Sequence, residues 1–205
     1  MRFNALSSSA LAVASAAGYA GLVLGEPRDR GDDEPELLEY IRNLKRGADA
    51  AGGRVVTLLG NHEVLNAVGA SGPFLSSRGA TAFGASRAEA FAPGGALASE
   101  LSSWPVVCVV GDTAFVHAGI VASDARRAAE LNAEASTWLA GGAGPLPPFS
   151  LLPASAAARS PVWMRDYSSP PDVEPPSATA CDEARSALAV LGASRLVVGH
   201  TVQSR

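Results

Sequence analysis

The residues best suited to chemistry in this chain are its three histidines, because an imidazole can bind a metal ion or move a proton near neutral pH. Each follows a short apolar run and has a glycine within two residues: His62, His117 and His200. In open α/β sheets, ligands gather just outside the carboxyl ends of the strands. An isolated Asn-His-Glu would more simply be a polar turn, but the threefold repetition predicts one sheet edge that collects a ligand.

The stretch around the first histidine organises the prediction. Residues 54–59 read as a strand in which the apolar residues do not strictly alternate, which is typical of a strand covered on both faces: Val55, Val56, Leu58 and Leu59. Gly60 then permits a tight turn that places Asn61 and His62 at the end of this strand. Asn61 adds an amide oxygen to the donors available there.

Upstream, residues 20–24 form an apolar run that predicts a first strand, parallel to 54–59. A helix should lie between them. Asp32 or Asp33 can cap it, and its apolar residues have helical spacing: Leu37, Leu38, Ile41 and Leu44. Gly52–Gly53 should end that helix before the central strand.

Downstream of His62 the pattern alternates between helices, loops and strands. It predicts a short helix over 64–68, a loop over 71–85, a helix from Ser86 that is interrupted at Pro93, and a second helical piece over 96–101. Two apolar runs, 105–110 and 113–117, are joined by Gly-Asp and predict a hairpin. We further expect helices over 124–139 and 182–191, a last strand over 196–199, and a Pro/Gly/Ser/Ala-rich connection over 141–176.

Composition indicates a globular protein. The chain has 205 residues, 47% hydrophobic and 18% charged, with a net charge of −4, which is enough for one domain and argues against a nucleic-acid surface. Two cysteines, Cys108 and Cys181, make no disulfide framework. No apolar run is long enough to span a bilayer.

The start of the chain has two interpretations. Residues 1–19 are either a targeting segment or low-complexity filler, and 20–205 form the domain. A signal peptide over 1–17 would direct the chain to secretion; otherwise a cytoplasmic or organellar location is favoured.

Four blocks occur in an order that resembles a known family: Asp29-Arg30-Gly31, Gly60-Asn61-His62-Glu63, Val116-His117-Ala118-Gly119 and Gly199-His200-Thr201. They resemble the calcineurin-like metallophosphoesterases of the phosphoprotein phosphatase type. The island 163–166 and the ending 199–203 are most similar to the bacterial-type, Shewanella-like phosphatases. The resemblance covers about residues 20–205 and implies an α/β fold, a partial metallophosphoesterase-type β-sandwich flanked by helices.

The resemblance also implies a mechanism and a set of roles. In that family two divalent metals, of the type Mn, Fe or Zn, share a water that attacks phosphorus. The implied metal ligands here are Glu26, Asn61, His117 and His200. His62 would protonate the leaving oxygen, oriented by Asp29. Arg30 and Arg165 would bind the phosphate oxygens of a phosphorylated protein or a small phosphomonoester.

The sequence departs from the family pattern in three places. Residues 1–24 contain no Asp and no His, so the Asp-x-His block that supplies the first metal is missing. Glu26 replaces the family's bridging Asp and is one methylene longer. No further strands follow Gly199-His200-Thr201. The chain thus resembles the middle of a phosphatase cut at both ends, and we expect one metal rather than two and reduced hydrolysis. The alternative is a catalytically inactive phosphatase-like binding protein.

Overall fold

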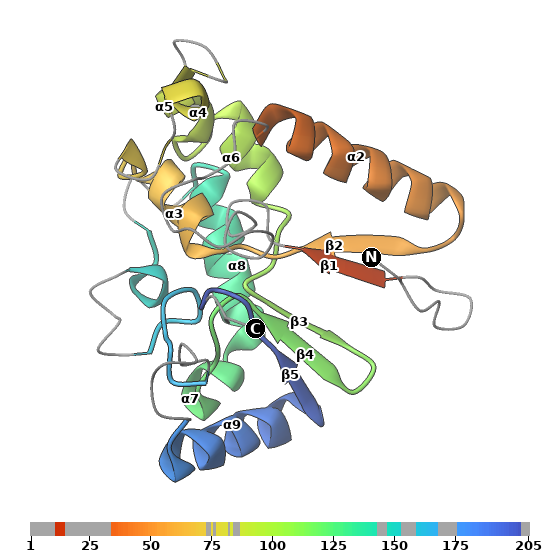
Figure 1. Ribbon diagram of the computed structural model, residues 1–205, viewed down its shortest axis with the longest axis vertical. Helices are drawn as coiled ribbons and strands as arrows, with labels where there is room; N and C mark the ends of the chain where they lie inside the picture. Colours follow the sequence, from red (N-terminus) through yellow and green to blue (C-terminus); the bar gives the residue numbers. More distant parts are fainter. Residues whose placement is uncertain are drawn as a thin grey trace.

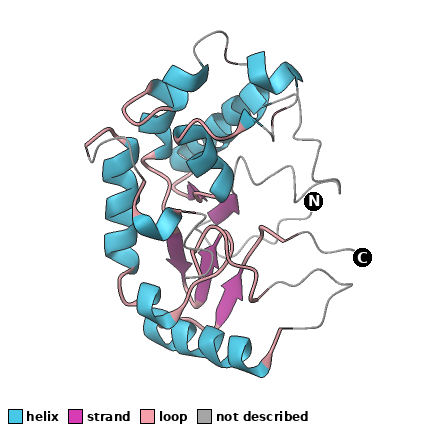
Figure 2. Ribbon diagram, turned by 90° about the vertical axis from the view of Figure 1, so that its left-hand side faces the viewer, coloured by secondary structure: helices cyan, strands magenta, loops and turns pink. Residues whose placement is uncertain are grey.

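The computed structural model describes residues 11–14, 34–72, 75, 77–81, 83, 87–142, 147–152, 159–167 and 176–201. Within them, two small sheets are flanked by helices (Figure 1). Helices α2 to α6 gather on one side of the strands and α9 lies on the other, as the view turned by 90° also shows (Figure 2). This arrangement confirms the predicted α/β class.

The first sheet is a parallel pair. Strand β1 (Leu11–Ala14) pairs with β2 (Arg54–Thr57), with Leu11 opposite Arg54. The predicted pairing partner was 20–24, which lies outside the described residues. Strand β2 is shorter than the predicted 54–59: Leu58 and Leu59 follow it as buried, non-strand residues.

The second sheet has three strands. β3 (Val107–Val110) and β4 (Thr113–Val116) form the predicted hairpin, and β5 (Arg195–Val197) lies parallel to β4 with Val197 opposite Phe115. The side chain of Asn132, on the neighbouring helix α8 (Ala128–Leu139), binds the backbone where β3 begins. Asn132 Oδ1 accepts the N–H groups of Val106 and Val107 at 2.8 and 3.0 Å, and its Nδ2 donates to the Val107 carbonyl at 2.9 Å.

Helix α2 (Glu34–Ala50) confirms the first predicted helix. Glu34 and Glu36 stand in its first turn, where they favour the positive end of the helix dipole. Leu38 and Ile41 are buried, but Leu44 is 40% exposed, so the apolar stripe is narrower than predicted.

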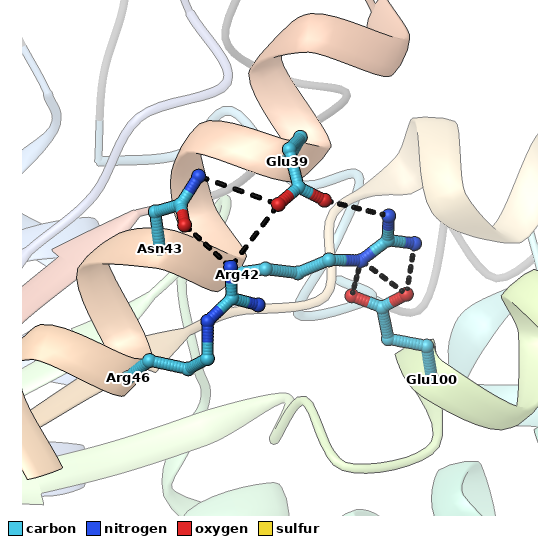
Figure 3. A network of polar contacts seen from close by, with 5 residues as sticks. All are labelled: Glu39, Arg42, Asn43, Arg46 and Glu100. Carbon is cyan, nitrogen blue, oxygen red and sulfur yellow. Dashed lines mark hydrogen bonds and ion pairs between the residues drawn. The ribbon is translucent and has the colours of Figure 1, made fainter.

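An ion-pair network holds α2 to α6 (Ala96–Leu101). Arg42 Nη2 lies 2.6 Å from Glu100 Oε2, and Arg42 Nε donates to the same carboxylate at 3.1 Å. Figure 3 shows Arg42 reaching both Glu100 and Glu39, while Arg46 and Asn43 complete the network on the α2 side.

Helix α3 (Asn61–Ala67) begins earlier than the predicted 64–68. Gly60 has extended backbone (φ −113°, ψ 177°), and its N–H donates to Glu63 Oε2 at 2.7 Å. A Glu in the third helical position that reaches back to the residue before the helix is a known start signal. Asn61 and His62 therefore stand in the first turn of a helix and not in a loop.

The region after α3 is more helical than predicted. The predicted loop 71–85 contains α4 (Ser77–Thr81), and α5 (Arg87–Phe91) follows, while Ser86 lies outside the described residues. The break between α5 and α6 spans residues 92–95 and includes Pro93, as predicted. A Cβ on Gly95 would lie 2.1 Å from the Glu89 carbonyl oxygen, so only glycine fits this turn.

The remaining helices surround the core. The predicted helix 124–139 is two helices, α7 (Ala122–Ala125) and α8, separated at Arg127 with φ −110° and ψ 16°. A short 3-10 helix, η3, spans Phe149–Leu151. Helix α9 (Ala178–Leu191) starts one turn earlier than predicted, because Ser177 Oγ accepts the Ala180 N–H at 3.1 Å.

The core lies between these helices and the sheets. Its largest fully buried side chains include Trp104, Trp138, Leu59, Val116 and Val162. Cys108 and Cys181 are both free thiols. Among the described helices, none combines the length and the apolar character needed to cross a membrane.

Candidate metal centre

Two of the three histidines meet because β4 and β5 are parallel neighbours. His117 directly follows β4, and the Gly199 N–H donates to the His117 carbonyl at 2.8 Å, which continues the strand pairing beyond β5. His200 then adopts φ 53°, a left-handed conformation that is uncommon for a residue with a side chain. The same end of the sheet thus presents both imidazoles.

Asn61 reaches this end from the other sheet. The Leu59 N–H donates to the Pro105 carbonyl at 3.0 Å, so the exit of β2 is tied to the entrance of β3. The turn at Gly60 and the start of α3 then direct the Asn61 amide toward His117.

Three donor atoms converge in what we call the histidine cluster: Asn61 Oδ1, His117 Nε2 and His200 Nδ1. The His117 nitrogen lies 2.9 Å from the amide oxygen and 3.1 Å from the His200 nitrogen. Ligands of one cation with metal–ligand bonds of roughly 2.1 Å lie about 3.0 Å apart at right angles. A proton on His117 Nε2 can serve both neighbours, and a cation can take its place.

Electrostatics favour the neutral form of His117. Burial first, and then the positive charges of His200 and Arg165, lower the pKa of His117 from 6.5 to about 3. A histidine must be neutral to bind a metal. His117 therefore needs no deprotonation to act as a ligand across the physiological pH range.

His62 lies beside the histidine cluster. It is 8% exposed, and Asn61 Nδ2 donates to His62 Nε2 at 3.4 Å. Asn61 contacts one histidine with each end of its amide, so His62 lies next to the pair formed by His117 and His200. The predicted residues Glu26, Asp29 and Arg30 lie outside the described part of the chain.

Arg165 lies at the edge of the histidine cluster. It is exposed, and its Nη1 donates to Thr201 Oγ1 at 3.1 Å, next to His200. Its charge acts on His117, as the lowered pKa of His117 shows. A permanently charged, planar guanidinium in this place suits the binding of an anion.

The loop that carries Arg165 is held from several sides. The Pro161 carbonyl accepts the Ala118 N–H at 2.8 Å, and Tyr167 Oη donates to the Ile120 carbonyl at 2.9 Å. Burial raises the pKa of Tyr167 to about 12, so this hydroxyl keeps its proton. A Cβ on Gly119 would lie 2.7 Å from Met164 Sδ. The loop therefore packs so closely on Gly119 that any side chain there would clash with it.

Some residues that support the site were not predicted. The Trp163 ring meets the His200 ring edge-on at 6.1 Å between centroids. Asn66 contacts the backbone of His62, and Arg87 contacts Asn66. The spacing of four residues between His62 and Asn66 on one helix was an available signal, whereas nothing near Arg87 in the sequence points to this role.

Amide oxygen and imidazole nitrogen are ligand types that divalent ions such as Mn, Fe or Zn accept. Within the described residues, no group of three or more His, Cys, Asp or Glu side chains could hold a metal. The histidine cluster therefore consists of two imidazoles and an amide, and no carboxylate of the described residues belongs to it.

No family model matches the chain. It is 28% identical over 228 residues to Shewanella-like protein phosphatase 2 of Arabidopsis thaliana, covering 88% of this chain and 56% of that protein. It is 31% identical over 201 residues to an uncharacterised protein of Schizosaccharomyces pombe, covering 91% of this chain and 57% of that protein. The chain thus spans about half the length of these curated relatives.

Solved structures share the fold. A cold-active protein tyrosine phosphatase superposes with a TM-score of 0.61 at 20% identity, covering 96% of this chain and 67% of that one. The cold-active protein-tyrosine phosphatase of a psychrophilic Shewanella species gives a TM-score of 0.53 at 19% identity, covering 96% and 68%. The chain is thus similar in sequence to a Shewanella-like phosphatase of Arabidopsis thaliana, and it shares its fold with these solved structures.

Proposed function

We propose that this chain provides part of a metal-dependent phosphatase site that hydrolyses phosphomonoesters. The observation that carries the proposal is the placement of His117 Nε2 at 2.9 Å from Asn61 Oδ1 and 3.1 Å from His200 Nδ1, which is the spacing of neighbouring ligands around one cation. The relative named as a phosphatase and the phosphatase structures with the same fold support the same reaction class.

In this proposal Asn61, His117 and His200 hold one divalent cation, and Glu26 supplies a carboxylate to it. Such a cation lowers the pKa of a bound water and polarises a phosphoryl oxygen. The protein's part is to keep His117 neutral and to hold both imidazoles at fixed positions. Burial of His117 and the pairing of Gly199 with His117 do both.

The other roles fall to residues around the cluster. His62, oriented by Asp29, gives a proton to the leaving oxygen. Arg30 and Arg165 bind the phosphate oxygens, and the exposed guanidinium of Arg165 beside Thr201 supports the second of these assignments.

The substrate class follows from family likeness. The resemblance of the four blocks favours phosphoserine or phosphothreonine in a protein, whereas the solved structures with this fold are named tyrosine phosphatases. A small phosphomonoester is a further candidate. Matched phosphoserine, phosphothreonine and phosphotyrosine peptides of one sequence would separate these classes by kcat/KM.

A second function is favoured by one feature of the sequence. Glu26 stands where the family has Asp, and a glutamate is one methylene longer. A chain with this ligand set can bind phosphate or a partner without turning over. Metal stoichiometry discriminates, because one or two ions per chain favour the enzyme and none, with the fold retained, favours the binding protein.

The test is hydrolysis of p-nitrophenyl phosphate with Mn²⁺ added, together with the metal content after dialysis. We expect one ion per chain and a low rate that is lost in His117→Ala and in His62→Ala. The His62→Ala variant should still bind the ion, because His62 is not in the histidine cluster. Absence of any bound ion in the folded wild-type chain would exclude the proposal, and a normal phosphatase rate would exclude the expected impairment.

A further inference from the structure

Arg87 makes a set of contacts that the proposed site does not explain. It is 7% exposed, although it is a permanently charged residue at the start of the five-residue helix α5. Its Nη1 and Nη2 donate to the two oxygens of Glu34 at 2.8 and 3.0 Å, which is a bidentate pair. Its Nη1 also donates to the Gly79 carbonyl at 3.0 Å.

The aromatic surroundings of Arg87 fix the plane of its guanidinium. The Cζ atom lies 5.0 Å from the Phe83 ring centroid and 4.8 Å from that of Phe91. The two rings meet edge-on at 5.5 Å. Cation–π contact with two rings leaves the guanidinium little freedom to rotate.

Asn66 connects Arg87 to the metal centre. Arg87 Nη2 donates to Asn66 Oδ1 at 2.8 Å, and Asn66 Nδ2 donates to the His62 carbonyl at 2.9 Å. Both ends of the Asn66 amide are therefore used, and Asn66 is 6% exposed. We call Glu34, Arg87 and Asn66 together the Arg87 clamp.

The clamp contacts a short helix. Helix α3 has seven residues, and helices shorter than about 12 residues are marginal by themselves. Its first turn carries Asn61 and His62. The clamp joins this helix to the start of α2 through Glu34, which follows Arg30 by only four residues in the sequence.

Stability alone is a weak reason for such a pair. Burying an arginine and a glutamate costs desolvation that their attraction often fails to recover, so an apolar pair of the same shape would serve stability as well. The planar guanidinium of Arg87, on α5, instead fixes the positions of α2 and α3 relative to each other through its contacts with Glu34 and Asn66. Outer-shell hydrogen bonds of this kind commonly tune metal sites.

We propose that Arg87 is a positioning residue: through Asn66 it fixes the first turn of α3, and with it the Asn61 ligand and the His62 imidazole. The inference rests on the proposed function only for the roles of Asn61 and His62. Arg87 and Asn66 touch neither metal nor substrate.

The test compares Arg87→Lys and Asn66→Asp with a matched control, Arg42→Lys. Lysine at 87 keeps the charge beside Glu34 but loses the fork. Aspartate at 66 keeps an acceptor for Arg87 but loses the donor to the His62 carbonyl. Arg42 also forms a bidentate pair with a glutamate, the more exposed Glu100, and this pair joins α2 to α6.

Two readouts are taken on the full chain. The first is the Co²⁺ dissociation constant by calorimetry, which we expect to rise about 10-fold in Arg87→Lys and Asn66→Asp and less than about twofold in Arg42→Lys. The second is the imidazole nitrogen NMR spectrum of the metal-free protein. This spectrum is simple to assign, because the chain has three histidines. We expect the His62 and His117 resonances to move in the first two variants and not in the control.

The outcomes separate the two proposals. A wild-type chain that binds no Co²⁺ contradicts the proposed function, and the NMR readout then decides the positioning role alone. A fall in melting temperature without a change in Co²⁺ affinity or in the histidine spectrum would make Arg87 merely structural and overturn the inference. If Arg87→Lys does not fold, Asn66→Asp decides, because it leaves the Arg87–Glu34 pair intact.

Discussion

At the scale of single residues, the site depends on an imidazole that stays neutral in a buried place. His117 is 4% exposed and contacts both Asn61 and His200 through one nitrogen. A protonated His117 would face the His200 ring and the Arg165 guanidinium without a carboxylate among its described contacts. The same burial that prepares His117 for a cation therefore makes the fold sensitive to acid.

This sensitivity gives a prediction for the metal-free protein. Because the pKa of His117 is about 3 in the folded chain against 6.5 in the unfolded chain, only the unfolded chain takes up this proton between those values. The free energy of unfolding should fall as pH decreases from 6.5 toward 3, by up to about 1.4 kcal/mol per pH unit from this group. Above pH 6.5 His117 contributes no pH dependence.

Urea titrations at a series of pH values measure the effect. His117→Gln cannot take up the proton, so its free energy of unfolding should depend less on pH in that window than that of the wild type. Equal slopes for the two proteins would show that His117 is protonated equally in the folded and unfolded chains.

At the scale of elements, one side chain of α8 determines how β3 begins. Asn132 satisfies three backbone groups of Val106 and Val107, and both of these residues are buried. Water cannot readily replace such bonds at a buried strand entrance. The entrance matters for the site, because Pro105 just before it accepts the Leu59 N–H that brings α3 to the second sheet.

Asn132→Ala should therefore lower the free energy of unfolding by about 2–3 kcal/mol, since it leaves buried donors and an acceptor unpaired. Chemical denaturation measures this loss. Asn132→Asp keeps the acceptor for both N–H groups and should lose less than Asn132→Ala. A change of under about 0.5 kcal/mol in the alanine variant would mean that other groups satisfy this backbone.

At the scale of the whole molecule, the site exists only because three distant segments meet. Asn61 belongs to α3 after the first sheet, whereas His117 and His200 follow two strands of the second. A cation held by all three would bind the folded chain and not the unfolded one. It would thus cross-link the two sheets.

We accordingly expect Mn²⁺ or Zn²⁺ to raise the melting temperature of the wild-type chain, with a stabilisation of about 2.7 kcal/mol when the ion is at 100 times its dissociation constant. His200→Ala should abolish most of the shift, because it removes one of the three donors. Differential scanning calorimetry with and without the ion measures both. An equal shift in His200→Ala would place the ion elsewhere.

The sequence by itself determined the local features. Apolar spacing located α2, β2 and α9 to within a turn, and Gly-Asp between two apolar runs located the β3–β4 hairpin, because burial periodicity is encoded in neighbouring residues. His117 and His200 each follow an apolar run. This position predicted that they lie at one edge of the sheet, because parallel strands end at the same edge.

Only the tertiary structure decided how these features meet. The contact between Asn61 and His117 joins residues 56 positions apart, and the Arg87–Glu34 pair joins residues 53 positions apart. Hydrogen-bond geometry over such separations follows from packing, which no local period carries. The sequence therefore identified the types of the site residues, whereas the distances between them and their supporting contacts depend on the fold.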